Sequence, residues 1–410
     1  MIDIKKLRDN PDFFKKSTAD KQRDPALVDK VLELDQQKRE VLQKVETLRA
    51  ERNALGKEGI GRGKEIKAEL DQLEEKLRSL DADLTVVVWK LPNPALENVP
   101  VGKDESKNME IKKWGETPKF DFEPKAHWLL GEDLDLIDTE RAGKVSGTRF
   151  GYLKNDAVLL EMALLHFGFK KLVEKGFVPI FPPVLIKKDV MSALGYNNYG
   201  WGETYQIRDE DLVLVATAEH AIVPYFKDEI LQESDLPRRF VGFSGAFRRE
   251  AGSYGKDTKG ILRVHQFNKL EMVSFCKPED SIAEHEFILG VEEELMQALK
   301  LPYHVMQMCT GDLGDPAAAK YDVEAWFPSE NKYRETHSCS NCTDYQARRL
   351  NIRFKRKSGE TEFVHILNGT AFSERPILAI LENYQKADGS VEIPEVLRPF
   401  IGKDTISPKR

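Results

Sequence analysis

Two runs of apolar residues near the N-terminus, spaced at alternating steps of four and three, constrain the fold of this chain most strongly. The first run covers residues 27–55 and the second 66–91, with four glycines among residues 56–63 between them. This spacing is the heptad pattern of a coiled coil, and Pro92 and Pro94 then end the second helix. The pattern predicts an antiparallel coiled-coil hairpin, roughly 40 Å long at 1.5 Å per residue.

The hairpin has two functional interpretations. A heptad seam alone favours an oligomerisation or spacer element, and the nearly balanced charges of the arm are typical of solvated outer faces. Basic residues nevertheless gather toward the tip, where a projecting rod could contact RNA phosphates. The residues of this basic group are Arg49, Arg52, Lys57, Arg62, Lys64 and Lys67.

Residues 240–275, FVGFSGAFRREAGSYGKDTKGILRVHQFNKLEMVSF, predict two strands joined by a glycine-rich loop. Because side chains alternate along a strand, one face of the pair would present charged groups and an aromatic ring. These side chains are Arg248 and Glu250 in the first strand and Arg263, Phe267, Lys269 and Glu271 in the second. A solvated charged edge is one interpretation. The other is a nucleotide site, because guanidinium groups bind phosphates and a ring stacks on a base.

Composition limits the class of protein. A chain of 410 residues with 40% hydrophobic residues can form two or three domains with a sizeable core. The absence of a long apolar run and of a signal-peptide pattern predicts a cytoplasmic protein that does not enter a membrane. A net charge of -7 argues against indiscriminate nucleic-acid binding. Cys339 and Cys342 form a CxxC without a second pair, so no structural zinc is expected.

Three stretches resemble the motifs of the class II aminoacyl-tRNA synthetases. Residues 240–275 resemble motif 2, and FRREAGSYGKDTKGILRVHQFNKLEMV is similar to the seryl-tRNA synthetase version in particular. KGFVPIFPPVLIKKD, residues 175–189, resembles motif 1, and FVHILNGTAFSERPILAILENYQK, residues 363–386, resembles motif 3. KYRETHSCSNCTDYQARR, which begins at Lys332, is also close to the seryl wording. The motifs follow the family's order, with the arm in front.

The resemblance implies an α+β fold. It consists of an N-terminal antiparallel helical coiled-coil arm and a class II catalytic domain built on an antiparallel β-sheet flanked by helices. We expect a tRNA-binding domain over residues 1–92, with the coiled coil at about 27–91, a linker over 93–130 and the catalytic domain over 131–410. Motif 1 implies a homodimer. No GxGxxG fingerprint or P-loop occurs, which agrees with a fold other than a Rossmann domain.

The resemblance also implies the reaction. L-serine and ATP would give seryl-adenylate, and the seryl group would pass to the 3' end of tRNA(Ser), and of tRNA(Sec) where the host has it. The implied ATP-binding residues are Arg248, Glu250, Arg263, Val264, Phe267, Glu335, Ser338 and Arg375. The implied serine-binding residues are Thr217, Glu219, Arg248, Glu271, Asn368 and Thr370. The implied catalytic residues are Arg248, Arg375 and Glu335, with Mg2+ on the ATP held by Glu335 and Ser338.

Local patterns give further expectations for these segments. Pro376 suits the first turn of a helix and would place Arg375 at its start, which is a good anion site. Strict alternation would put Glu335 and Ser338 on opposite faces, so a bend is expected between them. Glu374 departs from the family wording and would place a negative charge beside the arginine.

Three more segments carry expectations. Residues 211–222 predict a strand with Thr217 and Glu219 on one face. Residues 194–206, rich in glycine and aromatic residues, are a candidate mobile lid. A helix within residues 132–175 would bury one stripe, which consists of Val158, Met162, Leu165, Phe169 and Leu172.

Two other functions stay open at this point. One is a seryl-like ligase that loads a carrier protein, and the coiled-coil arm counts against it because such an enzyme has no need of a tRNA-reading rod. The other is a non-catalytic RNA-binding paralogue. The presence of both phosphate-binding arginines and of the acids beside them counts against that second alternative.

Overall fold

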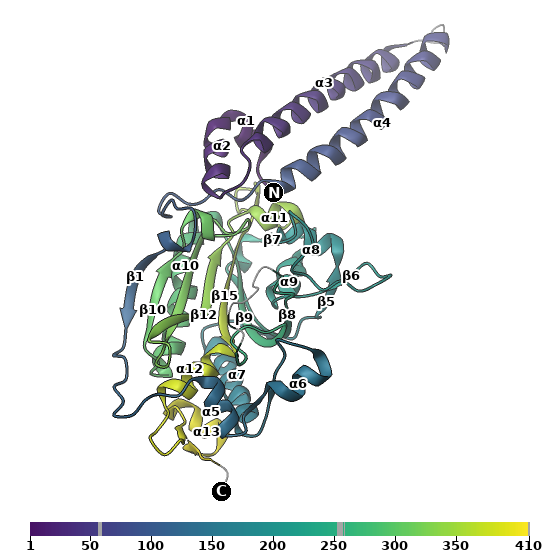
Figure 1. Ribbon diagram of the computed structural model, residues 1–410. Helices are drawn as coiled ribbons and strands as arrows, with labels where there is room; N and C mark the ends of the chain where they lie inside the picture. The colour runs from purple at the N-terminus through teal and green to yellow at the C-terminus, as the bar shows by residue number, and fades with distance from the viewer. Residues whose placement is uncertain (56–59, 252–256, 258, 409–410) are drawn as a thin grey trace. The chain divides into compact units, whose positions relative to one another are not determined.

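The computed structural model describes residues 1–55, 60–251, 257 and 259–408 of the chain (Figure 1). They form two compact units, residues 1–95 and 96–410. Among these residues, no helix is both long and apolar enough to cross a membrane.

The first unit contains the predicted helical hairpin. Helices α3 (Ala26–Ala54) and α4 (Ile60–Lys90) pack along each other, after the short helices α1 (Ile4–Asp9) and α2 (Pro11–Asp20). The apolar seam between α3 and α4 is buried as the heptads predict. Its buried residues are Val28, Val31, Leu34, Val41, Val45 and Leu48 in α3 and Ile66, Leu70, Leu80, Leu84 and Val88 in α4.

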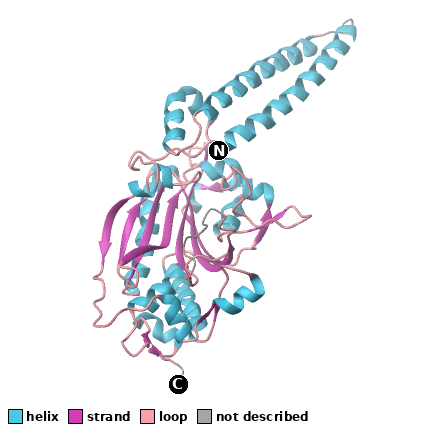
Figure 2. Cartoon of the chain, viewed as in Figure 1, coloured by secondary structure: helices cyan, strands magenta, loops and turns pink. Residues whose placement is uncertain are grey.

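An eight-stranded sheet forms the centre of the second unit (Figure 2). In spatial order its strands are β1 (Met109–Trp114), β10 (Tyr303–Gln307), β11 (Ala319–Phe327), β12 (Lys332–Asn341), β15 (His365–Ser373), β9 (Gln266–Cys276), β8 (Arg238–Phe247) and β4 (Val178–Ile180). Neighbouring strands are antiparallel, except that the edge strand β4 runs parallel to β8. The predicted α+β class and largely antiparallel sheet are confirmed.

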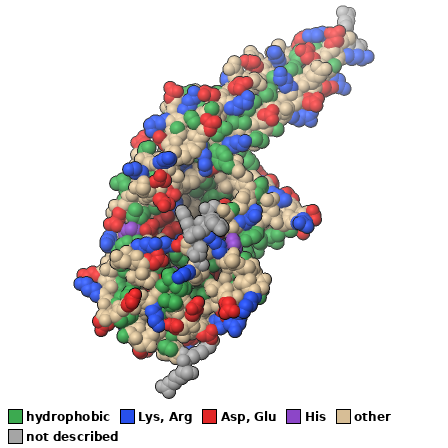
Figure 3. All heavy atoms as spheres, viewed as in Figure 1, with side chains coloured by type: hydrophobic (Ala, Val, Ile, Leu, Met, Phe, Trp, Pro, Cys, Tyr) green, Lys and Arg blue, Asp and Glu red, His purple; other side chains and the backbone are tan. Residues whose placement is uncertain are grey.

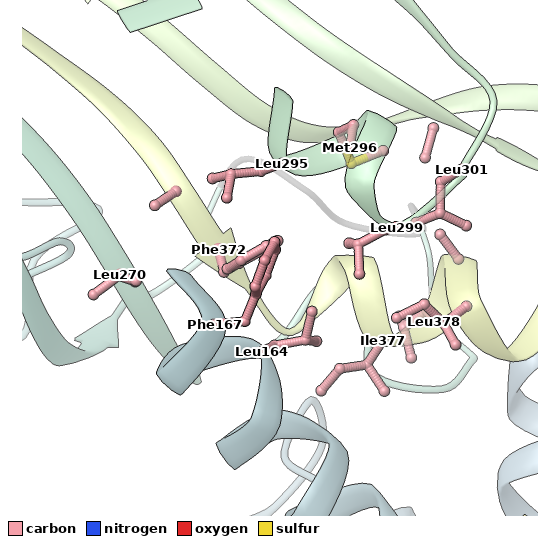
Figure 4. Close-up of a cluster of buried hydrophobic side chains, with 14 of the residues drawn as sticks. Leu164, Phe167, Leu270, Leu295, Met296, Leu299, Leu301, Phe372, Ile377 and Leu378 are labelled. Carbon is pink, nitrogen blue, oxygen red and sulfur yellow. The ribbon is translucent and has the colours of Figure 1, made fainter. Parts of the chain in front are cut away.

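Helices α7 (Asp156–Glu174), α10 (Ser281–Ala298) and α12 (Arg375–Asn383) pack against this sheet. Figure 4 shows Leu164 and Phe167 of α7 near Phe372 of β15 and Ile377 of α12. The rings of Phe167 and Phe372 lie 6.2 Å apart between centroids. This core fixes β15 and α12 relative to each other, so the loop between them has a defined position.

Shorter elements complete the second unit. The helices are α5 (His127–Asp133), α6 (Thr139–Ser146), α8 (Lys188–Leu194), α9 (Glu219–Ile222), α11 (Tyr345–Leu350) and α13 (Arg398–Ile401). The strands are β2 (Ile137–Asp138), β3 (Tyr152–Leu153), β5 (Leu185–Lys187), β6 (Leu212–Leu214), β7 (Ile230–Gln232), β13 (Arg353–Lys355), β14 (Thr361–Phe363), β16 (Val391–Glu392) and β17 (Thr405–Ile406).

Several strand predictions need correction. β8 ends at Phe247 and β9 begins at Gln266, so Arg248, Glu250 and Arg263 lie just beyond the strand ends and not within them. Glu250 has a φ of 50°, a left-handed conformation that ends strand alternation. The strand predicted over residues 211–222 stops at Leu214, and Glu219 begins helix α9.

Two further segments differ from their predictions. The stretch predicted as a linker contains β1, which forms an edge of the sheet and is mostly exposed, so its sequence lacks the alternation of a half-buried strand. In α7, Val158 and Met162 of the predicted stripe are exposed, whereas Leu160, Ala163 and Leu164 are buried. The buried face of α7 is therefore rotated from the predicted one.

Candidate active site

All of the side chains predicted to bind ATP line one cavity, which holds about 530 Å³ of open space. They are Arg248, Glu250, Arg263, Val264, Phe267, Glu335, Ser338 and Arg375, and Thr370 of the predicted serine site joins them. This volume lies within the range of small-molecule sites. Residues separated by more than a hundred positions in the sequence thus meet in one place.

Arg375 is positioned by the start of helix α12, as predicted, with Pro376 in the first turn. Its Nη1 donates to the Oε2 atom and to the backbone carbonyl of Glu335, both at 2.9 Å. Burial alone would raise the pKa of Glu335, but Arg375, together with Lys320, lowers it to about 2. Glu335 is therefore a carboxylate at neutral pH, and Arg375 is held against it at the cavity wall.

The predicted bend between Glu335 and Ser338 is confirmed. Register in the β11–β12 pair shifts between Val323 and Glu324, so that Val323 opposes His337 while Glu324 opposes Glu335. The extra residue is a β-bulge, which changes the alternation of faces. As a result both Glu335 and Ser338 line the cavity.

Arg248 and Arg263 approach the cavity from the ends of β8 and β9. The guanidinium carbon of Arg248 lies 5.0 Å from the centroid of the Phe267 ring. Burial lowers the pKa of Arg248, and Arg375 adds to this effect by repulsion. Arg263 is paired with Glu250 at 2.8 Å. Two guanidinium groups that repel each other across a cavity are stabilised by an anion between them, and phosphate suits both.

Lys269 and Glu271 lie next to each other along one face of β9. Lys269 Nζ lies 2.7 Å from Glu271 Oε2, and it also donates to Thr217 Oγ1 at 3.3 Å. Glu271 is 1% exposed, and Thr370 stands directly opposite it on β15. Burial raises the pKa of Glu271, and Lys269 opposes that shift. Three of the predicted serine-binding side chains, Thr217, Glu271 and Thr370, thus surround one lysine.

Glu219 is buried at the N-terminus of α9. Its Oε1 accepts hydrogen bonds from Tyr196 Oη at 2.8 Å and from Gln346 Nε2 at 3.2 Å. Burial and the charge of Glu271 raise the pKa of Glu219 to about 7. Asn368 is the exception among the predicted serine-binding residues. Its amide lies 3.9 Å from Cys342 Sγ, and it is not among the cavity-lining residues.

The cavity also contains residues for which the sequence predicted no role. These are Ile261, Leu262, Lys269, Thr336, Ser373 and Glu374. Lys269 was identified on the charged strand face but without a partner, because its ion pair depends on the strand pleat. Burial, together with Glu161, raises the pKa of Glu374 to about 8. The prediction of a negative charge beside Arg375 is therefore wrong, since Glu374 is mostly protonated at neutral pH.

The predicted phosphate-binding residues of the arm fall into separate groups. Arg49 pairs with Glu74 at 2.8 Å and Arg62 with Glu51 at 2.7 Å, so both are neutralised within the arm. The exposed side chains of Arg52, Lys64 and Lys67 have no ion pair with another residue that the structure describes. Lys57 lies outside the described residues. Figure 3 shows charges of both signs interspersed along the arm.

Two family models match the chain. The model described as tRNA synthetase class II core domain (G, H, P, S and T) matches residues 203–384, and the Seryl-tRNA synthetase N-terminal domain matches residues 1–95. Relatives named serine-tRNA ligase include those of Dictyoglomus turgidum, 46% identical over 425 residues, and Corynebacterium diphtheriae, 44% identical over 421 residues. In both cases the match covers 100% of this chain and of the relative.

Solved structures agree with the sequence comparison. The seryl-tRNA synthetase from Pyrococcus horikoshii complexed with ATP has a TM-score of 0.96 and 41% identity, with 100% of both chains covered. The cytoplasmic serine-tRNA ligase from Naegleria fowleri in complex with AMP has a TM-score of 0.90 and 34% identity. That match covers 98% of this chain and 96% of the other.

Proposed function

The chain belongs to the seryl-tRNA synthetase family, and from this premise we propose how the residues of its cavity ligate serine to tRNA. The observation that supports the proposal best is the meeting of two buried guanidinium groups, those of Arg248 and Arg375, with the Lys269–Glu271 pair in one small region. A triphosphate fits the first pair of groups, and a small zwitterion fits the second. ATP and AMP are bound by the relatives named above.

In the first step a carboxylate oxygen of serine attacks the α-phosphorus of ATP, and pyrophosphate leaves. In-line phosphoryl transfer needs positioning and charge neutralisation more than covalent chemistry from the protein. We assign Arg248 to the serine carboxylate and the α-phosphate, Arg375 to the γ-phosphate and Arg263 to the bent triphosphate. The adenine would stack on Phe267 with Glu250 near its amino group.

The wall formed by Glu335 and Ser338 fits a magnesium ion that arrives with ATP. A carboxylate and a hydroxyl are hard oxygen donors, and Mg2+ is commonly held by one or two carboxylates together with substrate phosphates. The low pKa of Glu335, about 2, keeps its carboxylate charged at neutral pH. When bound, the ion would neutralise phosphate charge. Glu335 would give up part of its contact with Arg375 to reach it.

In the second step the hydroxyl of the terminal tRNA ribose attacks the seryl carbonyl carbon, and AMP leaves with the bonding electrons. We propose that residues 1–95 recognise tRNA(Ser) through the arm and that residues 96–410 perform the chemistry. The same charged end would serve tRNA(Sec). One relative is described as cytoplasmic, and we propose that location for this protein.

Specificity for serine would come from Glu271 and Thr370. Alanine offers no hydroxyl, so the buried Glu271 would lose a partner, which at such a site lowers reactivity by roughly 10⁴-fold. Thr217 and Glu219 would hold the ammonium group.

ATP–pyrophosphate exchange with each of the twenty amino acids tests this function. We expect exchange with serine alone, and charging of tRNA(Ser) transcripts in a second assay. Serine-dependent exchange without tRNA charging would favour the carrier-protein ligase instead. The absence of exchange with every amino acid would identify a non-catalytic RNA-binding paralogue.

We also propose a homodimer formed through the motif 1 face. Large apolar side chains are exposed there, among them Met162 (51%), Val178 (47%) and Phe181 (77%). The Phe181 ring extends this patch, since it lies 6.0 Å from the rings of Phe169 and Phe243. A contiguous exposed apolar patch of this kind marks an interaction surface.

Replacing Met162 and Phe181 by glutamate should dissociate the dimer, because each charge would be buried in an apolar interface. Sedimentation velocity is expected to show the mass of two chains for the wild type and of one chain for the variant. The control is Val145→Glu, since Val145 is 71% exposed on α6 outside the patch. A double variant that sediments like the wild type would contradict the proposed interface.

A further inference from the structure

The loop of residues 194–206, predicted as a mobile lid, is anchored at several points in this structure. Asn198 Nδ2 donates to Asp315 Oδ2 at 3.1 Å and accepts at its Oδ1 from Arg349 Nη1 at 3.0 Å. The backbone N–H of Arg249, next to Arg248, donates to the carbonyl of Glu203 at 3.0 Å. One side chain of the loop, Tyr196, reaches a residue of the proposed serine pocket.

Tyr196 contacts Glu219 and the residue after it. Its hydroxyl donates to Glu219 Oε1 at 2.8 Å, and its ring lies 4.9 Å from the imidazole of His220 between centroids. The ring contact fixes the direction of the hydroxyl. Gln346 Nε2, on helix α11, donates to the same oxygen at 3.2 Å. Both neutral donors therefore hold Oε1 and turn Oε2 away from themselves.

We infer that Tyr196 is a positioning residue of the serine pocket, whose hydroxyl orients Glu219 so that its second carboxylate oxygen receives the ammonium group of serine. The inference rests on the proposed function. It deepens that function by assigning a role in amino-acid binding to a loop that departs from the family's sequence pattern. Nothing in the chemistry requires Tyr196 to contact the reacting atoms.

The charges around Glu219 explain why a donor is needed there. Glu219 is 3% exposed. The groups that act on it are Glu271 and Lys269 from β9, Tyr196 from the loop and Gln346 from α11. Burial and Glu271 disfavour its ionised form, whereas Tyr196, Gln346 and Lys269 favour it, and the resulting pKa is about 7. Burial lowers the pKa of the adjacent His220 to about 3, so that imidazole is neutral at neutral pH.

The direction of the pH effect follows from these contacts. Glu219 must be ionised to bind an ammonium group, and its pKa lies near neutrality, so serine binding weakens as the pH falls below about 7. Removing the Tyr196 hydroxyl takes away an interaction that lowers this pKa. The variant's Glu219 would then ionise only at higher pH, and its defect would be largest near neutral pH and would shrink in alkali.

The test is Tyr196→Phe in the full-length enzyme, assayed by serine-dependent pyrophosphate exchange from pH 6.5 to 9. Loss of a hydrogen bond to a charged group predicts a KM for serine about tenfold higher at pH 7. We expect the KM for ATP and kcat to change little and the serine defect to narrow toward pH 9. Phenylalanine keeps the ring contact with His220, so the fold should persist.

Tyr152→Phe is the matched control, because Tyr152 is an exposed tyrosine of β3 at a distance from the serine pocket in the sequence and the fold. An unchanged KM for serine at every pH in Tyr196→Phe would overturn the inference. Equal increases in KM for serine and for ATP would also overturn it, because they would show a structural role for the loop. A wild-type enzyme without serine-dependent exchange would instead refute the proposed function.

Discussion

Replacing Glu271 by alanine is expected to lower serine-dependent pyrophosphate exchange by roughly 10³-fold in kcat/KM. The substitution removes the proposed acceptor of the serine hydroxyl. It also leaves the Lys269 ammonium, 9% exposed and 2.7 Å from Glu271, without its charged partner. An unpaired buried charge is costly, and Lys269 would then repel the ammonium of the incoming serine.

Structural damage must be separated from loss of binding, since breaking a buried ion pair destabilises a fold by about 3–5 kcal/mol. ATP binding, measured directly by calorimetry, is the internal control, because Arg248 and Arg375 hold the nucleotide without help from Glu271. We expect the variant to bind ATP like the wild type. Glu279→Ala, which removes a surface partner of Arg356 at 2.9 Å, is a matched control on exchange. Near-normal exchange by Glu271→Ala would remove Glu271 from the serine site.

Local patterns predicted the parts of the fold that depend on neighbours in sequence. The hairpin of α3 and α4 follows from apolar spacing alone, and the start of α12 at Arg375 follows from Pro376. The bulge between Glu335 and Ser338 was also predictable, because both residues were expected at one site and strict alternation could not bring them there.

Features that depend on distant contacts were not predictable in the same way. Alternation along residues 240–275 placed Arg248 in a strand, but β8 ends one residue earlier, where the chain turns toward the cavity. Tyr196 meets Glu219 across 23 positions, and no periodic pattern records that hydrogen bond. The exposed Met162 has the same physical origin, because a helix face that contacts a second chain looks in sequence like one that contacts the core.

Replacing the tip of the arm, Leu55–Ile66, by a turn of about four residues should leave exchange unchanged and reduce tRNA charging by at least roughly a hundredfold. The remaining helices keep the ion pairs Lys38–Asp81 and Arg49–Glu74, so the shortened hairpin should fold. Exchange and charging are measured on the same preparation. Equal losses in both would mean that the tip stabilises the protein and does not bind tRNA.

Charge reversal at the tip tests the phosphate contacts without changing the length of the arm. Arg52, Lys64 and Lys67 are exposed, whereas Arg49 and Arg62 are already paired with acids. If these three exposed cations bind phosphates, reversing them should lower the dependence of log K for tRNA on log salt by up to about three, one per contact. The matched control reverses three exposed cations farther from the tip, Lys44, Lys76 and Arg78. An equal effect of both triple variants would mean that the net charge of the arm, and not its tip, governs tRNA binding.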